Sequence, residues 1–244
     1  MATYVLIHDT WHTGKALEPT ASLLGEAGHR VDTPTVAGNR PGDPKTVGLD
    51  DAIRSIADYL AEQNLTDVIL LGHGYGGMII TGVADRLAER IRRLVYWNAF
   101  VPNNGESLND MAVYVRLCTA QRGDGSITLP FKIWRETFIN DVDRETAQKA
   151  YDTLVPHPEK TLWIKSRSRP IQRTWSWINR SSTTPTMPGC RIGIRGIRSC
   201  RENWVCSVWC KRPAAMNCVF RMVQLTVNLR LGADQRSWLF RCLF

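Results

Sequence analysis

A glycine-rich turn between an apolar strand and a helix is the feature that most constrains this 244-residue chain. Residues 68–71 are apolar at consecutive positions, which is typical of a strand buried on both faces of a parallel sheet. Four glycines follow within residues 72–77, and a helical pattern begins at Met78. A strand that enters a helix through such a turn lifts one side chain above the sheet and points the helix N-terminus at it. The residue at that position is Gly74.

The segments around this turn alternate between strand and helix. We expect strands at residues 4–7, 30–34 and 94–97, and helices at residues 17–28, 49–60 and from 78 onward. Such alternation predicts an α/β fold with a mostly parallel central sheet and helices on both faces. Residues 105–160, with a helix expected over 141–154, are predicted to form a small lid over the carboxyl edge of the sheet.

The chain resembles the α/β-hydrolase superfamily, near the small esterases, plant methyl esterases and hydroxynitrile lyases. The segments that carry the resemblance follow the family's order and spacing: Val5-Leu6-Ile7-His8, Gly28-His29-Arg30-Val31, Gly72 to Ile80, Leu94-Val95-Tyr96 and Ala99 to Pro102. The resemblance implies one α/β-hydrolase domain over residues 1–244, with its clear core at residues 4–110. It also implies hydrolysis of a small ester, lactone or amide through an acyl-serine intermediate, with hydroxynitrile cleavage as a second activity of the scaffold.

The family pattern at the turn is the nucleophile elbow G-x-S-x-G, and residues 72–76 supply all of it except the serine, which is replaced by Gly74. The resemblance assigns the oxyanion hole to the backbone N–H groups of Thr10 and Tyr75. It also places three side chains at the pocket: His8, Asp9 and His73. Each of these histidines, like Tyr75, has a plainer interpretation as a packing or turn residue.

Two further positions depart from the family pattern. Asp9 stands where esterase relatives usually have glycine, and a carboxylate beside the oxyanion loop would oppose an anionic intermediate. Asn98 stands where close relatives often have aspartate. The lack of a serine at position 74, together with the missing histidine and acid described next, predicts that the chain is inactive, or nearly so, by the acyl-serine mechanism.

The family's catalytic triad pairs the serine with a histidine and an acidic residue, and neither has a match in this chain. The family takes both from loops late in the sequence, yet no histidine follows His157. Residues 163–244 carry thirteen Arg and two Lys against two acidic residues, and they hold six of the seven Cys and six of the nine Trp. The chain's net charge of +8 therefore comes from this segment alone.

Out-of-frame translation of a GC-rich gene can produce such a composition. When residues 214–217 are back-translated and shifted by one base, they become Gly-Ser-His-Glu, which resembles the family's segment around the catalytic histidine. The same shift turns residues 183–190 into a sequence like the family's acid loop, and residues 201–212 into a plausible late strand. Residues 163–171 also become an ordinary polar segment in that frame. We therefore predict that residues 163–244 are an aberrant tail, the frameshifted rendering of a normal hydrolase C-terminus.

Two other classes of function stay open at this stage. One is a non-catalytic small-molecule binder on the same fold. The other is a dinucleotide-binding protein, because Gly72, Gly74 and Gly77 satisfy G-x-G-x-x-G. That fingerprint needs an acidic residue about twenty positions later, and the chain has Trp97 and Asn98 there.

The remaining patterns exclude several partners. The tail lacks a clustered basic stripe, so no nucleic-acid partner is expected. Its cysteines are not in C-x-x-C pairs, so no metal site is expected at Cys190, Cys200, Cys206 and Cys210. No apolar run has the length of a membrane span and no signal-peptide pattern is present, which predicts a cytoplasmic protein with a small-molecule substrate and no cofactor. The oligomeric state is left open.

Overall fold

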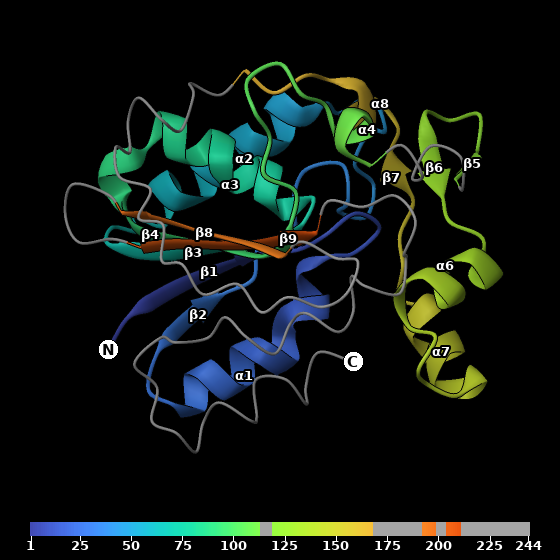
Figure 1. Ribbon diagram of the computed structural model, residues 1–244, viewed down its shortest axis with the longest axis horizontal. Helices are drawn as coiled ribbons and strands as arrows, with labels where there is room; N and C mark the ends of the chain where they lie inside the picture. The colour runs from blue at the N-terminus through green and yellow to red at the C-terminus, as the bar shows by residue number, and fades with distance from the viewer. Residues whose placement is uncertain (113–118, 168–191, 199–203, 211–244) are drawn as a thin grey trace.

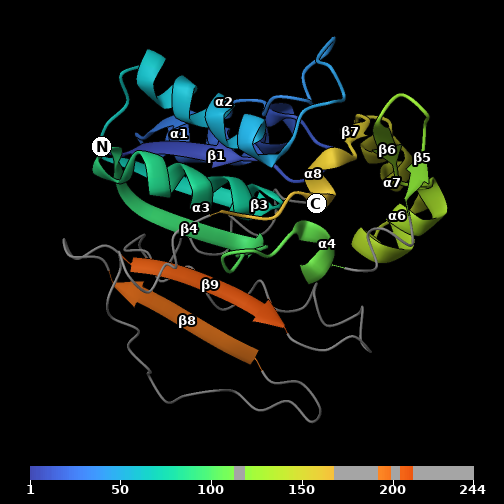
Figure 2. The same ribbon diagram turned by 90° about the horizontal axis from the view of Figure 1, so that it is seen from above.

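The computed structural model of the chain describes residues 1–112, 119–167, 192–198 and 204–210 (Figure 1). Its central sheet has six strands in the order β2-β1-β3-β4-β9-β8. Their bounds are β1 (Thr3–Ile7), β2 (Arg30–Asp32), β3 (Val68–Gly74), β4 (Ile91–Ala99), β8 (Ile192–Arg198) and β9 (Trp204–Cys210). Strands β2, β1, β3, β4 and β9 run parallel to one another, whereas the edge strand β8 pairs antiparallel with β9. Figure 2 shows β4, β9 and β8 following one another across the sheet. The predicted mostly parallel sheet is confirmed.

Helices cover both faces of this sheet, as the alternating pattern predicted. Helix α1 (Glu18–Glu26) lies on one face, and helices α2 (Leu49–Glu62) and α3 (Gly76–Arg86) lie on the other (Figure 1). Successive residues of β1 point to opposite faces. Leu6 therefore packs in the cluster that includes Leu24 of α1, whereas Ile7 packs in the cluster that includes α2 and α3. Two short 3-10 helices complete this part of the chain, Gly14–Leu17 and Ala88–Arg90.

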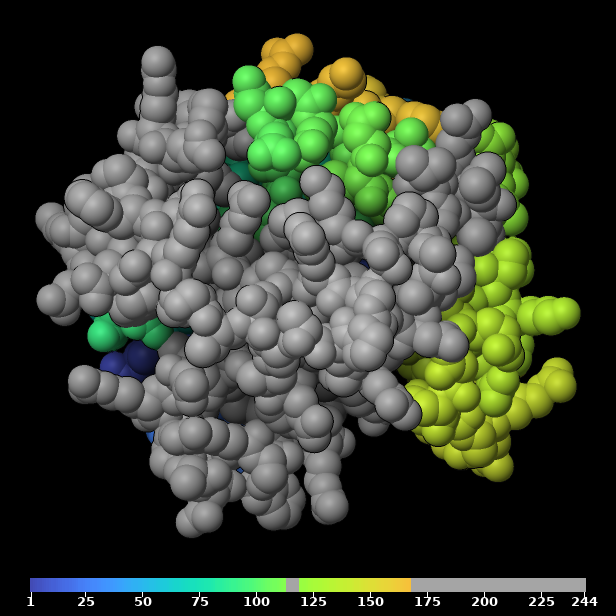
Figure 3. Space-filling view, in the orientation of Figure 1, coloured from blue at the N-terminus to red at the C-terminus, as the bar shows by residue number. Residues whose placement is uncertain are grey.

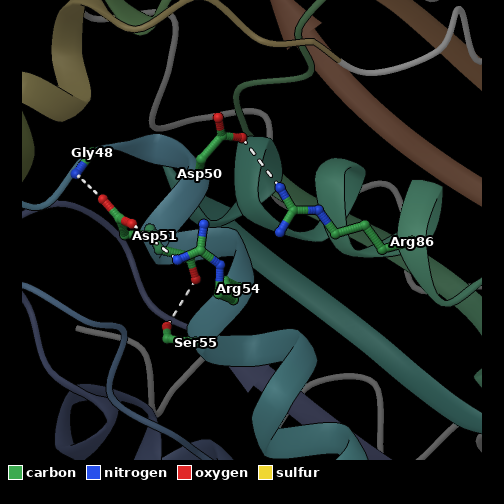
Figure 4. Close-up of polar contacts among 7 residues, drawn as sticks. Gly48, Asp50, Asp51, Arg54, Ser55 and Arg86 are labelled. Carbon is green, nitrogen blue, oxygen red and sulfur yellow. Dashed lines mark hydrogen bonds and ion pairs between the residues drawn. The ribbon is translucent and has the colours of Figure 1, made fainter.

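Helices α2 and α3 are joined by apolar packing and by one ion pair. Gly82 of α3 gives Ile53 of α2 room, because a Cβ atom at position 82 would overlap the Ile53 side chain. Arg86 reaches from α3 to Asp50 at the start of α2, with 3.2 Å between Nη2 and Oδ1 (Figure 4). The Asp51 carboxylate accepts a hydrogen bond of 3.0 Å from the Gly48 N–H, which satisfies a donor at the helix N-terminus.

The segment predicted as a lid is built from short elements beside the sheet. They are α4 (Leu108–Met111), β5 (Ala120–Gln121), β6 (Ser126–Thr128), α6 (Phe131–Phe138), α7 (Arg144–Tyr151), β7 (His157–Pro158) and α8 (Lys160–Trp163). Strands β5, β6 and β7 form a small antiparallel sheet. In Figure 3 much of this segment forms one side of the molecule in yellow-green. Helix α7 is shorter than the helix expected over 141–154, because Asp143 caps its N-terminus by accepting a 2.9 Å hydrogen bond from the Thr146 N–H.

Trp11, which follows β1, ties this segment to the carboxyl edge of the sheet. Its indole N–H donates to the Ile127 carbonyl at 3.2 Å, and its own carbonyl accepts from the Val155 N–H at 2.8 Å. The segment therefore sits beside the strand ends where the glycine-rich turn lies. Within the described ranges, no helix combines the length and apolar character needed to cross a bilayer. Residues 183–190 and 214–217, on which the frameshift prediction depends most, lie outside the described residues.

Candidate active site

The glycine-rich turn has the strand–turn–helix geometry that its sequence predicts. Strand β3 runs further than expected, since Gly72 and His73 pair with Tyr96 and Trp97 of β4. The strand ends at Gly74, and α3 begins two residues later. Gly74 has a φ of +53°, in the left-handed region that glycine adopts at little cost. The chain therefore turns from β3 into α3 at position 74, which is buried at the carboxyl end of β3.

Three of the four glycines in the turn are required by backbone contacts. A Cβ atom at Gly72 would lie 2.5 Å from the Gly76 carbonyl oxygen. At Gly76 it would lie 2.6 Å from the Ile7 carbonyl oxygen, and at Gly77 it would lie 2.5 Å from that of Phe100. Backbone atoms of this kind cannot move aside, so these glycines allow α3 to pack closely on the strand ends.

The fourth glycine faces a side chain instead of backbone. A Cβ atom at Gly74 would overlap the carboxyl group of Asp9, the second residue after β1. Asp9 Oδ1 accepts hydrogen bonds from the Tyr75 N–H at 2.6 Å and from the Thr10 N–H at 2.7 Å. These are the two N–H groups that the family resemblance assigned to the oxyanion hole. Tyr75 is also the N-cap of α3, so the carboxylate lies at the positive end of the helix dipole.

His8, predicted at the pocket, is buried with both ring nitrogens engaged. Its Nε2 accepts from the Val36 N–H at 3.0 Å, which places the proton on Nδ1, and Nδ1 donates to the Asp9 carbonyl at 2.8 Å. Burial lowers the pKa of His8 to about 4, so the ring is neutral near pH 7. It holds the loop after β1 and carries no free nitrogen for proton transfer.

The His73 ring lies against Trp97, with 4.3 Å between the ring centroids. Burial lowers the pKa of His73, and the nearby Asp9 charge opposes that shift. Asn98, the other departure from the family pattern, is exposed at the end of β4 with a φ of +43°. It lies at the register shift where β4 passes the turn, between the partners of His73 and Gly74.

His157 of β7 is a site neighbour that sequence analysis did not connect to the turn. Its ring packs edge-on against Tyr75, with 5.3 Å between the ring centroids. Its Nδ1 lies 3.0 Å from Asn39 Oδ1 and its Nε2 lies 2.8 Å from Thr161 Oγ1. Asn39 Nδ2 donates to the His12 carbonyl at 2.7 Å, so Asn39 Oδ1 is an acceptor and the His157 proton is on Nδ1.

Burial lowers the pKa of His157 to about 3, with smaller contributions from His8, Lys45 and His12. The neutral ring links the loop that holds Asn39 to helix α8, which holds Thr161. Because both its nitrogens are used in this link, His157 acts as a support for Tyr75. Asn39 and His157 lie 118 residues apart, so no local pattern predicts their contact.

The family to which the chain belongs is shown by comparison with known proteins. The Alpha/beta hydrolase family matches residues 4–199. The chain belongs to this family. The sequence is 50% identical over 111 residues to a carbendazim hydrolyzing esterase of a Nocardioides species, a match that covers 44% of this chain and 46% of that protein. It is 30% identical over 105 residues to the alpha-hydroxynitrile lyase of Arabidopsis thaliana, covering 41% of this chain and 40% of the lyase. This α/β hydrolase thus spans less than half the length of these relatives.

Solved structures agree with the family assignment. An extracellular alpha/beta-hydrolase from a Paenibacillus species superposes with a TM-score of 0.64 at 35% identity, over 68% of this chain and 70% of that one. A pyrethroid hydrolase from Sphingobium faniae superposes with a TM-score of 0.59 at 22% identity, over 69% of this chain and 72% of its own. At that identity the pyrethroid hydrolase supports the fold alone.

In this α/β hydrolase, the glycines that match the dinucleotide fingerprint already have close neighbours. Gly72 and Gly77 lie against backbone, and Gly74 lies against the Asp9 carboxylate. Of the four cysteines considered for a metal site, Cys190 and Cys200 lie outside the described residues, and Cys206 and Cys210 belong to β9.

Proposed function

We propose that this chain is an α/β hydrolase of the small-ester type in which the acyl-serine reaction has been lost. Gly74 carries this proposal, since it stands at the left-handed turn between β3 and α3 where the family places its serine. Without a hydroxyl at that position, no acyl-enzyme can form there. The site residues of the proposal are Gly74 for the nucleophile position, Thr10 and Tyr75 for the oxyanion hole, and Asp9 as the group that fills it.

Asp9 adds a second obstacle to ester hydrolysis. An oxyanion hole lowers the barrier because its N–H groups are oriented toward the oxygen that becomes negative. Here one carboxylate oxygen already accepts from both N–H groups. A substrate carbonyl oxygen would have to displace that negative charge, so the two donors are not available to a tetrahedral intermediate.

The missing histidine and acid belong to the same proposal. We attribute their absence to a shifted reading frame from about Trp163, so that the domain of residues 1–244 has a clear core at 4–110, a lid at 105–160 and an aberrant tail at 163–244. Resequencing the gene together with an intact mass of the native protein tests this. An unbroken frame and a mass that matches the printed sequence would reject the frameshift.

Binding of a small molecule without turnover is the alternative within the same fold, and the esterase relatives favour a small ester or amide as ligand. Dinucleotide binding is less favoured, because the Asp9 carboxylate over Gly74 would repel a pyrophosphate. A cytoplasmic location belongs to this proposal, although a structural relative is extracellular.

Ester turnover by the full chain is the decisive assay. With p-nitrophenyl acetate and butyrate, we expect rates equal to those of buffer and of the heat-denatured chain, with no saturation in substrate. A saturable rate above these backgrounds would contradict the loss of catalysis. A companion chain should carry Asp9→Gly, Gly74→Ser and a frame-corrected C-terminus. If that chain also failed on a broad ester panel, the ester-hydrolase assignment would lose its support.

A further inference from the structure

The backbone donors beside Asp9 form a site for a small carboxylate, and Asp9 is its built-in occupant. We propose that removal of the Asp9 side chain opens this site to a free carboxylate such as formate or acetate, and that positions 9 and 74 together decide which anion the site holds. The inference rests on the proposed function only in naming the site as the family's oxyanion hole. The binding that it predicts requires no ester turnover.

The contacts of Asp9 have the features of a formed anion site. Two N–H groups converge on one oxygen at 2.6 and 2.7 Å, which are short, charge-assisted distances. The two donors come from the ends of different strands, and the Tyr75 donor is 66 residues from Asp9, so the convergence is a product of the fold. Thr10 and Tyr75 are both buried. Without the carboxylate, two buried donors at the N-terminus of an 11-residue helix would lack an acceptor.

Gly74 and Asp9 depend on each other sterically. A side chain at position 74 begins with a Cβ atom, and that atom would overlap the Asp9 carboxyl group. Conversely, an Asp9 side chain in the hole requires glycine at position 74. Gly74→Ser alone would therefore displace the carboxylate from its two donors without leaving the site clear. Removal of the Asp9 side chain, with glycine kept at position 74, is therefore the change that clears the site for an external anion.

Thermal unfolding of the full chain with added anions tests the site. In sodium chloride at pH 7.5, Asp9→Ala should lower Tm by at least about 5 °C, because both N–H groups lose their acceptor. Replacing the chloride with formate at constant ionic strength should restore part of this loss with a saturable dose dependence. Asp9→Asn is the matched control, since its isosteric side chain keeps an acceptor oxygen in the hole. Neither Asp9→Asn nor the unsubstituted chain should respond to formate beyond chloride.

Equal formate responses of the Asp9→Ala and unsubstituted chains would overturn the proposal, and so would an unchanged Tm for Asp9→Ala. If Asp9→Ala is unfolded in chloride, formate should drive its folding, followed by circular dichroism. Failure of formate to do so would also overturn the proposal.

A double-mutant cycle tests the steric half of the inference independently. Gly74→Ala should lower Tm more in the unsubstituted chain than in the Asp9→Ala chain, because the overlapping carboxyl group is absent from the latter. Equal losses in both backgrounds would reject the link between the two positions. Neither measurement depends on catalysis. If the chain hydrolyses esters, and both the formate response and the double-mutant cycle come out as expected, the proposed function is refuted and the anion site stands.

Discussion

The two buried histidines of the site should make this hydrolase sensitive to mild acid. The pKa of His157 is lowered to about 3 and that of His8 to about 4, in both cases chiefly by burial. The ordinary value in an unfolded chain is about 6.5. The folded state therefore favours the neutral rings. This contribution to stability is fully present above pH 6.5 and is lost as the pH falls from 6.5 toward the folded pKa values.

The size of the loss follows from these shifts. At pH 5 the unfolded chain binds nearly one proton at each ring, whereas the folded chain binds very little. Integration from pH 8 to pH 5 gives a loss of about 2 kcal/mol in unfolding free energy for each histidine, or about 4 kcal/mol together. Protonation would also turn His8 Nε2 from an acceptor into a donor, against the Val36 N–H.

Urea unfolding at pH 8, 6.5 and 5 measures this effect, with tryptophan fluorescence as the signal. We expect the stability of the unsubstituted chain to fall relative to that of His157→Gln by about 2 kcal/mol between pH 8 and pH 5. The reasoning would be refuted if the unsubstituted chain and His157→Gln lost the same stability over this range, since the His157 proton would then not be linked to folding.

Two further substitutions probe the packing around the turn, again by urea unfolding. Gly76→Ala should lower the unfolding free energy by at least about 2 kcal/mol, because its Cβ would lie 2.6 Å from the Ile7 carbonyl oxygen. Gly25→Ala in α1 is the control, since it has free space and should be neutral or stabilising by up to about 1 kcal/mol. Equal losses in the two variants would argue against the close approach at Gly76. Thr81→Val should cost about 1–3 kcal/mol, because the buried Tyr96 hydroxyl loses its 2.8 Å partner, and Tyr96→Phe added to it should then cost little more. Strictly additive costs would contradict the pairing of these two hydroxyls.

Much of the α/β core follows from short-range patterns in the sequence. The period of 3.6 in α2 identifies its buried face, and all four residues that show it are buried: Leu49, Ile53, Ile56 and Leu60. The apolar run at residues 68–71 identifies β3 as a central strand. The predicted end of β3 was wrong by three residues, since glycine has a low strand propensity and Gly72 nevertheless pairs with Tyr96. Pairing with a neighbouring strand overrides local preference there.

The contacts that join the predicted site residues do not follow from the sequence. Sequence comparison marks Asp9 and Gly74 as two separate departures from a family pattern. Their contact depends on β1 and β3 being parallel neighbours that end at the same edge of the sheet. The link from Asn39 through His157 to Thr161 likewise joins a loop to helix α8, and no periodicity in the sequence predicts it.

The neighbours of each glycine separate what the turn says about folding from what it says about chemistry. Gly72, Gly76 and Gly77 face backbone atoms, so the chain needs them to pack α3 on the sheet whether or not a reaction occurs there. Their presence is therefore evidence for the fold and carries no information on activity. Position 74 faces the Asp9 side chain instead of backbone atoms, so the space available to a residue there depends on position 9. Under the proposed function, Asp9 and Gly74 decide the chemistry of this site as a pair, and the turn keeps its geometry whether or not a nucleophile stands at position 74.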